Sequence, residues 1–210
     1  MKHQVWNSEL DPQVRLEQLG LNDTALYEAV KNGCLTRKRF TDNHPRISIG
    51  IAIWAEIVAR LREILIPLGW EKSDKSNYEL VINQSLNLAI AVAAGDEFTG
   101  SMQATPSNKC PKGTNTIDAV STNNQIDMFA EYLPVPAINK DSFSTWILLH
   151  YYSADEIRLE LSLPSEIGAD GRIKGWKERI ILKPISLDEV PVSFPSVEMQ
   201  DIEIDVRRKA

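Results

Sequence analysis

The polar segment of residues 95–116 contains the side chains best suited to binding a charged ligand. It follows a predicted strand and reads GDEFTGSMQATPSNKCPKGTNT. Irregular segments of this length inside a compact domain are uncommon and are usually functional or disordered. Two adjacent acids can hold a divalent metal through oxygen ligands, and lysines beside glycine and threonine can bind phosphate. The candidate ligand-binding residues are Asp96, Glu97, Thr99, Lys109, Lys112 and Thr114. The alternative interpretation is an ordered loop whose charges only keep it soluble.

A second candidate surface is the basic segment of residues 31–46. It carries five cations against a single acid, Asp42, and lies between two predicted helices. Cations grouped in this way can contact a phosphate backbone. No clear helix-turn-helix pattern accompanies them, so a solvated surface is the competing interpretation. The candidate nucleic-acid-binding residues are Lys31, Arg37, Lys38, Arg39 and Arg46.

Searches for catalytic motifs with short signatures find none. Gly95 and Gly100 have the glycine spacing of a phosphate-binding loop, but Ser101 stands where that loop needs lysine. No acid is followed two residues later by lysine, as many metal-dependent nucleases require. The three histidines are scattered, and Cys34 and Cys110 lie far apart, so no metal site can be assembled at recognised spacings. We therefore expect no resident cofactor. Mg²⁺ or Mn²⁺ is expected only under the alternative hypothesis, in which residues 95–116 act on a phosphorylated substrate.

Composition indicates a soluble globular protein. The 210 residues include 23 Lys and Arg against 29 Asp and Glu, a net charge of -6. This balance opposes a dedicated nucleic-acid binder, which usually has a basic domain or face. The longest helical apolar stretch, residues 47–59, is interrupted by Glu56 and is too short to span a bilayer. The N-terminus lacks a secretory h-region, so we expect a cytoplasmic protein without a membrane partner.

The first third of the chain has helical patterning. Asp11 and Pro12 form an N-cap and a first helical turn, and Gly20 closes that helix. Asn22 or Asp23 begins a second helix over residues 24–32, with Gly33 as its stop. A longer helix is predicted over residues 45–66, because its apolar residues recur at helical spacing on one face.

The rest of the chain is rich in predicted strands. Alternating apolar residues mark strands near 78–82, 86–92, 144–152, 156–163 and 176–182, and a helix is expected over 116–132. In the fourth of these strands, Arg158, Glu160 and Ser162 should form a wet face, and His150 should point to an edge or to the wetter face. Strands and helices do not alternate regularly. This order favours an α+β fold with N-terminal helices and a mainly antiparallel sheet.

We divide the chain into an N-terminal helical segment (1–44), an α+β core domain (45–190) and a C-terminal extension (191–210). The extension contains a last alternating segment, residues 201–206.

Four stretches together carry a family resemblance. They are NHPRISIGIAIWAEIVARLREILIPLGW, GDEFTG followed by PSNKCPKGTNT, LELSLP and WKERIIL. Across residues 26–182 the chain resembles an uncharacterised family of bacterial proteins associated with phages, plasmids and integrative elements. The resemblance carries no catalytic residues over. It implies a mobile-element or phage-defence setting, in which accessory and regulatory proteins are common.

The leading expectation from the sequence is a non-enzymatic accessory or regulatory protein that binds another macromolecule, with a protein partner. One alternative is a metal-dependent enzyme or ligand-binding domain that acts on a nucleotide or phosphorylated substrate through residues 95–116. Another is a nucleic-acid binder that uses residues 31–46. The oligomeric state and the identity of the partner do not follow from the sequence.

Overall fold

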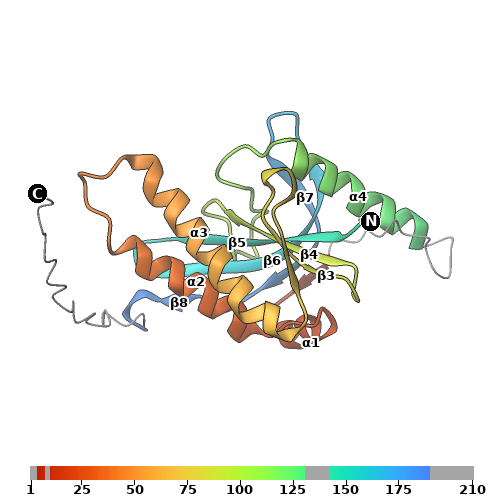
Figure 1. The fold of residues 1–210 in the computed structure, drawn as a ribbon, viewed down its shortest axis with the longest axis horizontal. Coiled ribbons are helices and arrows are strands. Elements are labelled where there is room, and N and C mark those ends of the chain that lie inside the picture. The colour runs from red at the N-terminus through yellow and green to blue at the C-terminus, as the bar shows by residue number, and fades with distance from the viewer. Residues whose placement is uncertain (1–3, 8–9, 131–141, 190–210) are drawn as a thin grey trace, which may run out of the picture.

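The structure, a computed structural model, describes residues 4–7, 10–130 and 142–189. Its architecture is α+β, as the element order predicts (Figure 1). The helices are α1 (Pro12–Gln18), α2 (Asp23–Arg37), α3 (Arg46–Leu65) and α4 (Thr114–Ala130). The strands are β1 (Gln4–Trp6), β2 (Glu71–Ser73), β3 (Leu80–Asn83), β4 (Leu88–Ala94), β5 (Ser144–Tyr152), β6 (Glu156–Ile167), β7 (Ile173–Ile181) and β8 (Ile185–Ser186).

The strands form one eight-stranded sheet in the order β1-β7-β6-β5-β4-β3-β2, with β8 added beside β6. The sheet is mixed, so the prediction of a mainly antiparallel sheet is wrong. Strands β4 and β5 are parallel because α4 crosses over between them, and β1 pairs in parallel with β7. The remaining neighbours are antiparallel.

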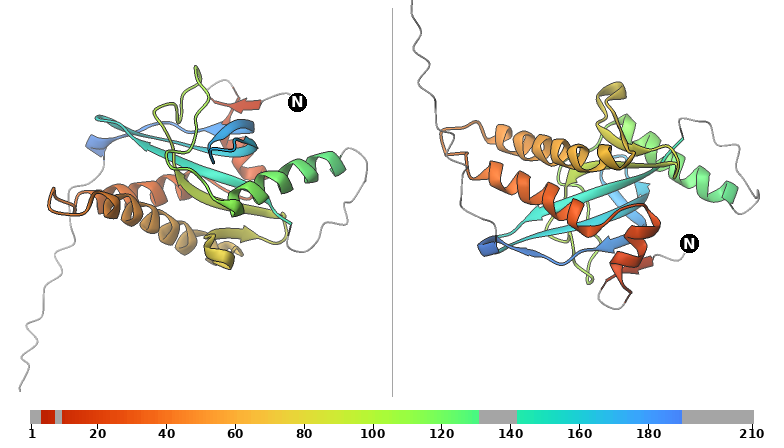
Figure 2. Two further views of the ribbon diagram at one scale, coloured as in Figure 1. Left: turned by 90° about the horizontal axis from the view of Figure 1, so that it is seen from above. Right: turned by 60° about the horizontal axis from the view of Figure 1, so that its bottom comes forward.

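Helices cover both faces of this sheet. Helices α1, α2 and α3 share one hydrophobic cluster with Ile90, Leu148 and Leu161, which project from one face. Figure 2 shows α2 and α3 side by side along that face. Helix α4 lies against β5 and β6 on the other face, where Ala91, Ala93 and Leu149 form a smaller cluster. Strand β4 is therefore buried on both faces, as its alternation of large residues and alanine predicts.

Polar contacts join helix α4 to the sheet. The Asn123 amide donates to the carbonyls of Thr145 and Pro164, and its oxygen accepts from the Thr145 N–H at 2.8 Å. Asn124 donates to the Ser165 carbonyl. The asparagines that weaken the helical pattern of this segment are thus the residues that fix the helix against β5 and β6.

The N-termini of α1 and α2 confirm their capping signals, whereas α4 begins at Thr114, two residues before the predicted start. Asp11 accepts from the Gln13 N–H and Asn22 from the Ala25 N–H, so both are N-caps. Gly33 does not end α2, which continues to Arg37, so that prediction is wrong. A Cβ at Gly33 would lie 2.6 Å from Ile57 Cγ1, and the glycine therefore permits close packing of α2 on α3.

Several strand boundaries also differ from the prediction: β3 begins at Leu80 and not at residue 78, β6 extends to Ile167, and β7 begins at Ile173. Leu86 lies in the turn before β4 and is 45% exposed, whereas the alternation placed it in the strand. The predicted C-terminal segments, 191–210 and the strand-like 201–206 within it, fall outside the described residues. No helix in the described ranges has both the length and the apolarity needed to cross a bilayer.

Candidate functional site

The segment that joins β4 to α4 is fixed to the sheet along its length. Asn108, which is fully buried, donates to the carbonyls of Cys110 and Gly171 and accepts from the Ile173 N–H. The Trp176 indole donates to the Pro106 carbonyl at 2.8 Å. These bonds link the segment to β7 and to the turn before it. The segment is an ordered cover over one face of the sheet.

A buried ion pair provides the strongest attachment. The Arg179 guanidinium donates to both carboxylate oxygens of Glu160 and to the carbonyls of Ser101 and Ala104. Glu160 also accepts from the Gly100 N–H at 2.8 Å. Exposure of the two side chains is 3% for Arg179 and 0% for Glu160. The predicted wet face of β6 is therefore wrong at Glu160 and Ser162, because the segment of residues 95–113 covers them.

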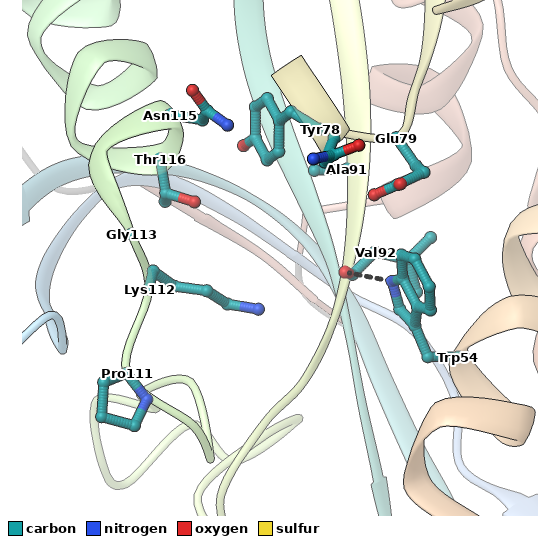
Figure 3. Close-up of a pocket in the computed structure, with 11 residues that line it drawn as sticks. Trp54, Tyr78, Glu79, Ala91, Val92, Pro111, Lys112, Gly113, Asn115 and Thr116 are labelled. Carbon is teal, nitrogen blue, oxygen red and sulfur yellow. Dashed lines mark hydrogen bonds between the residues drawn. The ribbon is translucent and has the colours of Figure 1, made fainter. Parts of the chain in front are cut away.

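A pocket of about 300 Å³ lies where this segment meets the start of α4 (Figure 3). It opens beside Val92, since β3 begins at Leu80 opposite Ala91 and leaves the rest of β4 without a β3 partner. Four parts of the chain form its walls. Its lining residues are Trp54 from α3, Asn77, Tyr78 and Glu79 before β3, Ala91 and Val92 from β4, and Pro111, Lys112, Gly113, Asn115 and Thr116 around the start of α4.

Lys112 supplies the positive charge of the pocket. Figure 3 shows its side chain projecting into the cavity from the segment before α4. Its backbone N–H is bonded to the Gly171 carbonyl at 2.9 Å, which fixes the start of the side chain. Burial lowers the pKa of the Lys112 ammonium below its ordinary value. Across the described ranges, no hydrogen bond or ion pair engages this ammonium group.

Two hydroxyl groups lie on the same side of the pocket. The Tyr78 hydroxyl is buried and has no hydrogen-bond partner of normal geometry among the described residues. Burial raises the pKa of Tyr78, and the neighbouring Thr116 side chain offsets part of that rise. Thr116 belongs to the first turn of α4, where backbone N–H groups and the helix dipole favour an anion. The arrangement offers several donors to a negatively charged group.

Trp54 and Glu79 enter the pocket from the α3 and β3 side. The Trp54 indole donates to the Val92 carbonyl at 3.2 Å, which holds the ring in place. Glu79 is half-buried, and its carboxylate makes no hydrogen bond or ion pair with any described residue. The pocket therefore contains an unpaired cation, an unpaired anion and a fixed aromatic ring.

Of the six predicted ligand-binding residues, only Lys112 lines this pocket. The Asp96 carboxylate accepts from the N–H groups of Phe98 and Ser107, and Thr99 is buried against Gly95. Burial raises the pKa of Asp96, with its two backbone hydrogen bonds opposing the rise. The other three, Glu97, Lys109 and Thr114, are exposed outside the pocket. The described residues contain no group of three or more His, Cys, Asp or Glu placed to hold a metal ion.

Sequence reasoning missed Trp54, Tyr78, Glu79 and Thr116. Trp54 belongs to the apolar stripe of its helix, and Tyr78 alternates with apolar residues, so neither pattern distinguishes a pocket residue from a core residue. Glu79 has no motif around it. The only available signal was Thr116, which the pattern placed at a helix start, a position that favours anions.

The basic segment forms the exposed connection between α2 and α3. Arg37 lies at the end of α2, with its guanidinium over the Tyr152 ring at 5.5 Å, and Arg46 begins α3. The remaining cations of the set are Lys31, which is half-buried, and Lys38 and Arg39, which are exposed. Ile47 and Ile51 are 73% and 55% exposed on the adjoining turns of α3. Cations and apolar side chains thus share one protruding end of the helix pair.

His150 is placed differently from the prediction, since it is buried at 4% exposure instead of lying at an edge. Neither ring nitrogen has a hydrogen-bond partner in the described structure, and the ring meets Tyr152 edge-on. Burial, assisted by the charge of Lys112, lowers the pKa of His150 to about 4. The imidazole is consequently neutral at pH 7.

No family model matches the chain, and neither the curated proteins nor the solved structures contain a match. The candidate site rests on its own geometry.

Proposed function

We propose that this protein is a ligand-binding domain that takes a small anionic or phosphorylated molecule in the pocket at the start of α4. The observation that carries the proposal is the Lys112 ammonium, which projects into the cavity without a counter-ion among the described residues. A partly desolvated cation is costly unless an anion compensates it. Perturbed groups in clefts are accordingly candidates for functional sites.

The surroundings of Lys112 support an anion over other ligands. The start of α4 contributes the positive end of its helix dipole, and the hydroxyls of Tyr78 and Thr116 lie beside it. The Lys112 backbone is bonded to Gly171, so the ammonium is presented by a fixed segment. Because the donors are already in place, little ordering would be required when an anion binds.

A binding role accords with the expectation of a non-enzymatic accessory protein. In that proposal, occupancy of the pocket reports the level of a small molecule to a protein partner, in a mobile-element or phage-defence setting. The exposed Ile47 and Ile51 beside Arg46 favour the end of the α2–α3 pair as the surface that contacts the partner. Apolar residues rimmed by charge are typical of interaction sites.

Isothermal titration with inorganic phosphate and with pyrophosphate tests the pocket. Lys112→Met removes the charge while keeping much of the apolar stem, and Lys109→Met, on the exposed part of the same segment, is the matched control. We expect Lys112→Met to weaken binding at least tenfold and Lys109→Met to change it less than twofold. Equal affinities for both variants, or no binding by the wild type, would overturn the proposal.

The basic surface is tested separately by binding to duplex DNA at two salt concentrations. If this surface binds nucleic acid, affinity falls steeply with salt, and Arg39→Gln with Arg46→Gln reduces it. If it binds a protein partner, the partner recovered from the host survives nuclease treatment and is lost with Ile47→Ser and Ile51→Ser.

A further inference from the structure

The pocket contains more than an anion site, because a carboxylate and an aromatic ring face it together with Lys112. This inference rests on the proposed function and identifies the chemistry of the rest of the ligand. Glu79 contributes a carboxylate to the wall of the pocket. A carboxylate only accepts hydrogen bonds, and its two oxygens match two adjacent N–H donors in one plane. A planar pair of N–H donors is the ligand group that uses both oxygens at once.

Trp54 contributes an aromatic ring to the same wall. Its indole N–H is held by the Val92 carbonyl, so the ring orientation is set before a ligand arrives. Figure 3 shows the ring beside the Glu79 carboxylate, on the far side of the cavity from Lys112. Flat π systems and guanidinium groups stack on indole rings. A group that satisfies Glu79 in its plane can also place a face on Trp54.

The size of the cavity limits the size of the ligand. About 300 Å³ is at the lower end of the range for small-molecule sites. A volume of this order limits the ligand to a small molecule, on the scale of one nucleotide or one amino acid. One such molecule would then have to contact both Lys112 and Glu79.

We infer that the ligand combines a guanidine-type group, with two adjacent N–H donors that bind Glu79 and a flat face on Trp54, with an anionic group that binds Lys112. Two common compounds have this chemistry. A guanine nucleotide presents the N1–H and the 2-amino group of its base and a phosphate. Free arginine presents its guanidinium group and a carboxylate.

Titrations of the full-length protein with GMP, IMP, AMP, arginine and inorganic phosphate distinguish these sources. IMP keeps the N1–H but lacks the 2-amino group, and AMP lacks both donors. We expect GMP to bind at least tenfold more tightly than AMP, with IMP in between, if the source is a guanine nucleotide. Tight binding of arginine with weak binding of all three nucleotides assigns the site to the amino acid.

Two variants test the roles of the wall residues. Glu79→Gln should weaken the preferred ligand at least tenfold and leave the phosphate affinity within twofold, with Glu97→Gln as the exposed control. Trp54→Leu should weaken the same ligand at least fivefold and also spare phosphate. These variants report specificity, since Lys112 remains intact in both.

The two proposals fail in different ways. One outcome is that phosphate binding requires Lys112, while GMP and AMP bind with equal affinity and arginine does not bind. This outcome refutes the inference about the guanidine-type group and leaves the anion site standing. An unchanged affinity in Glu79→Gln has the same meaning. If no compound binds in a manner that requires Lys112, the proposed function is refuted and this inference with it.

Discussion

Replacing Glu160 by glutamine tests whether the buried ion pair with Arg179 holds the segment of residues 95–113 in place. Glutamine keeps the shape and one acceptor oxygen but removes the charge. Arg179, only 3% exposed, then remains in the interior without a counter-ion. Breaking a buried pair in this way typically costs about 3–5 kcal/mol, because the remaining charge is desolvated without compensation.

Urea denaturation measures this cost. With a slope of about 2.5 kcal/mol/M, a loss of about 4 kcal/mol lowers the unfolding midpoint by about 1.6 M. The exposed pair of Arg60 with Glu28 is the control, since Arg60→Met should cost at most about 1 kcal/mol. Because Gly100, Ser101 and Ala104 are bonded to the pair, trypsin should also cleave Glu160→Gln faster after Lys109.

Adding Arg179→Met to Glu160→Gln completes a double-mutant cycle. The second change removes the stranded charge, so the double variant should lose about 2 kcal/mol less than the two single variants added together. The reasoning is refuted if the two effects add, or if Glu160→Gln costs less than about 1 kcal/mol. Either result would mean that water reaches the pair.

Three further predictions concern titration and backbone geometry. The pKa of His150 is about 4 when folded and about 6.5 when unfolded, so the unfolded chain binds the extra proton between these values. The free energy of unfolding should therefore fall by roughly 3 kcal/mol as the pH drops from 6.5 to 4. In urea denaturation at several pH values, His150→Leu should abolish that part of the fall. An unchanged pH dependence in this variant would contradict the burial of a neutral ring. Since burial lowers the pKa of Lys112, the ammonium should lose its charge, and phosphate affinity should fall, at a lower pH than for an ordinary lysine. Titrations at pH 8, 9 and 10, all above the second ionisation of phosphate, measure this fall, and a loss of affinity confined to the highest pH would contradict the prediction. Gly171→Ala should weaken phosphate binding at least fivefold although residue 171 is outside the pocket, because φ is +70° there and a Cβ would lie 2.7 Å from the Lys112 carbonyl oxygen. Gly50→Ala is the control, since a Cβ there meets nothing within 4 Å and the residue lies outside the pocket, and equal effects of the two changes would contradict this reasoning.

The local elements were largely predictable because their signals are local. Asp11 and Asn22 cap helices through contacts within three residues, and the alternation of Leu88 to Ala93 reflects two covered faces. The failures came from contacts distant in sequence. Gly33 has the type of a helix stop, yet its role is set by Ile57, and no pattern within α2 contains that neighbour.

The same reason explains what the sequence could not show about the site. Glu160 alternates with apolar residues as a solvent-facing acid would, and only the return of residues 100–104 over β6 buries it. Lys112 was identifiable because it lies in a long polar segment. Trp54 and Glu79 join it only through the tertiary fold, since they come from α3 and from the start of β3.

The parallel pairing of β1 with β7 has a consequence for synthesis on the ribosome. Trp6 donates to Glu178, 172 residues later, and Arg15 is bonded to the same carboxylate. At about 5–20 residues per second, the N-terminal strand waits roughly 10–35 s for its neighbour to be made. Until then, Trp6 and the apolar side of α1 have no sheet edge to cover. Strand β1 can therefore join the sheet only after β7 has been made, which places this pairing among the last steps of folding during synthesis.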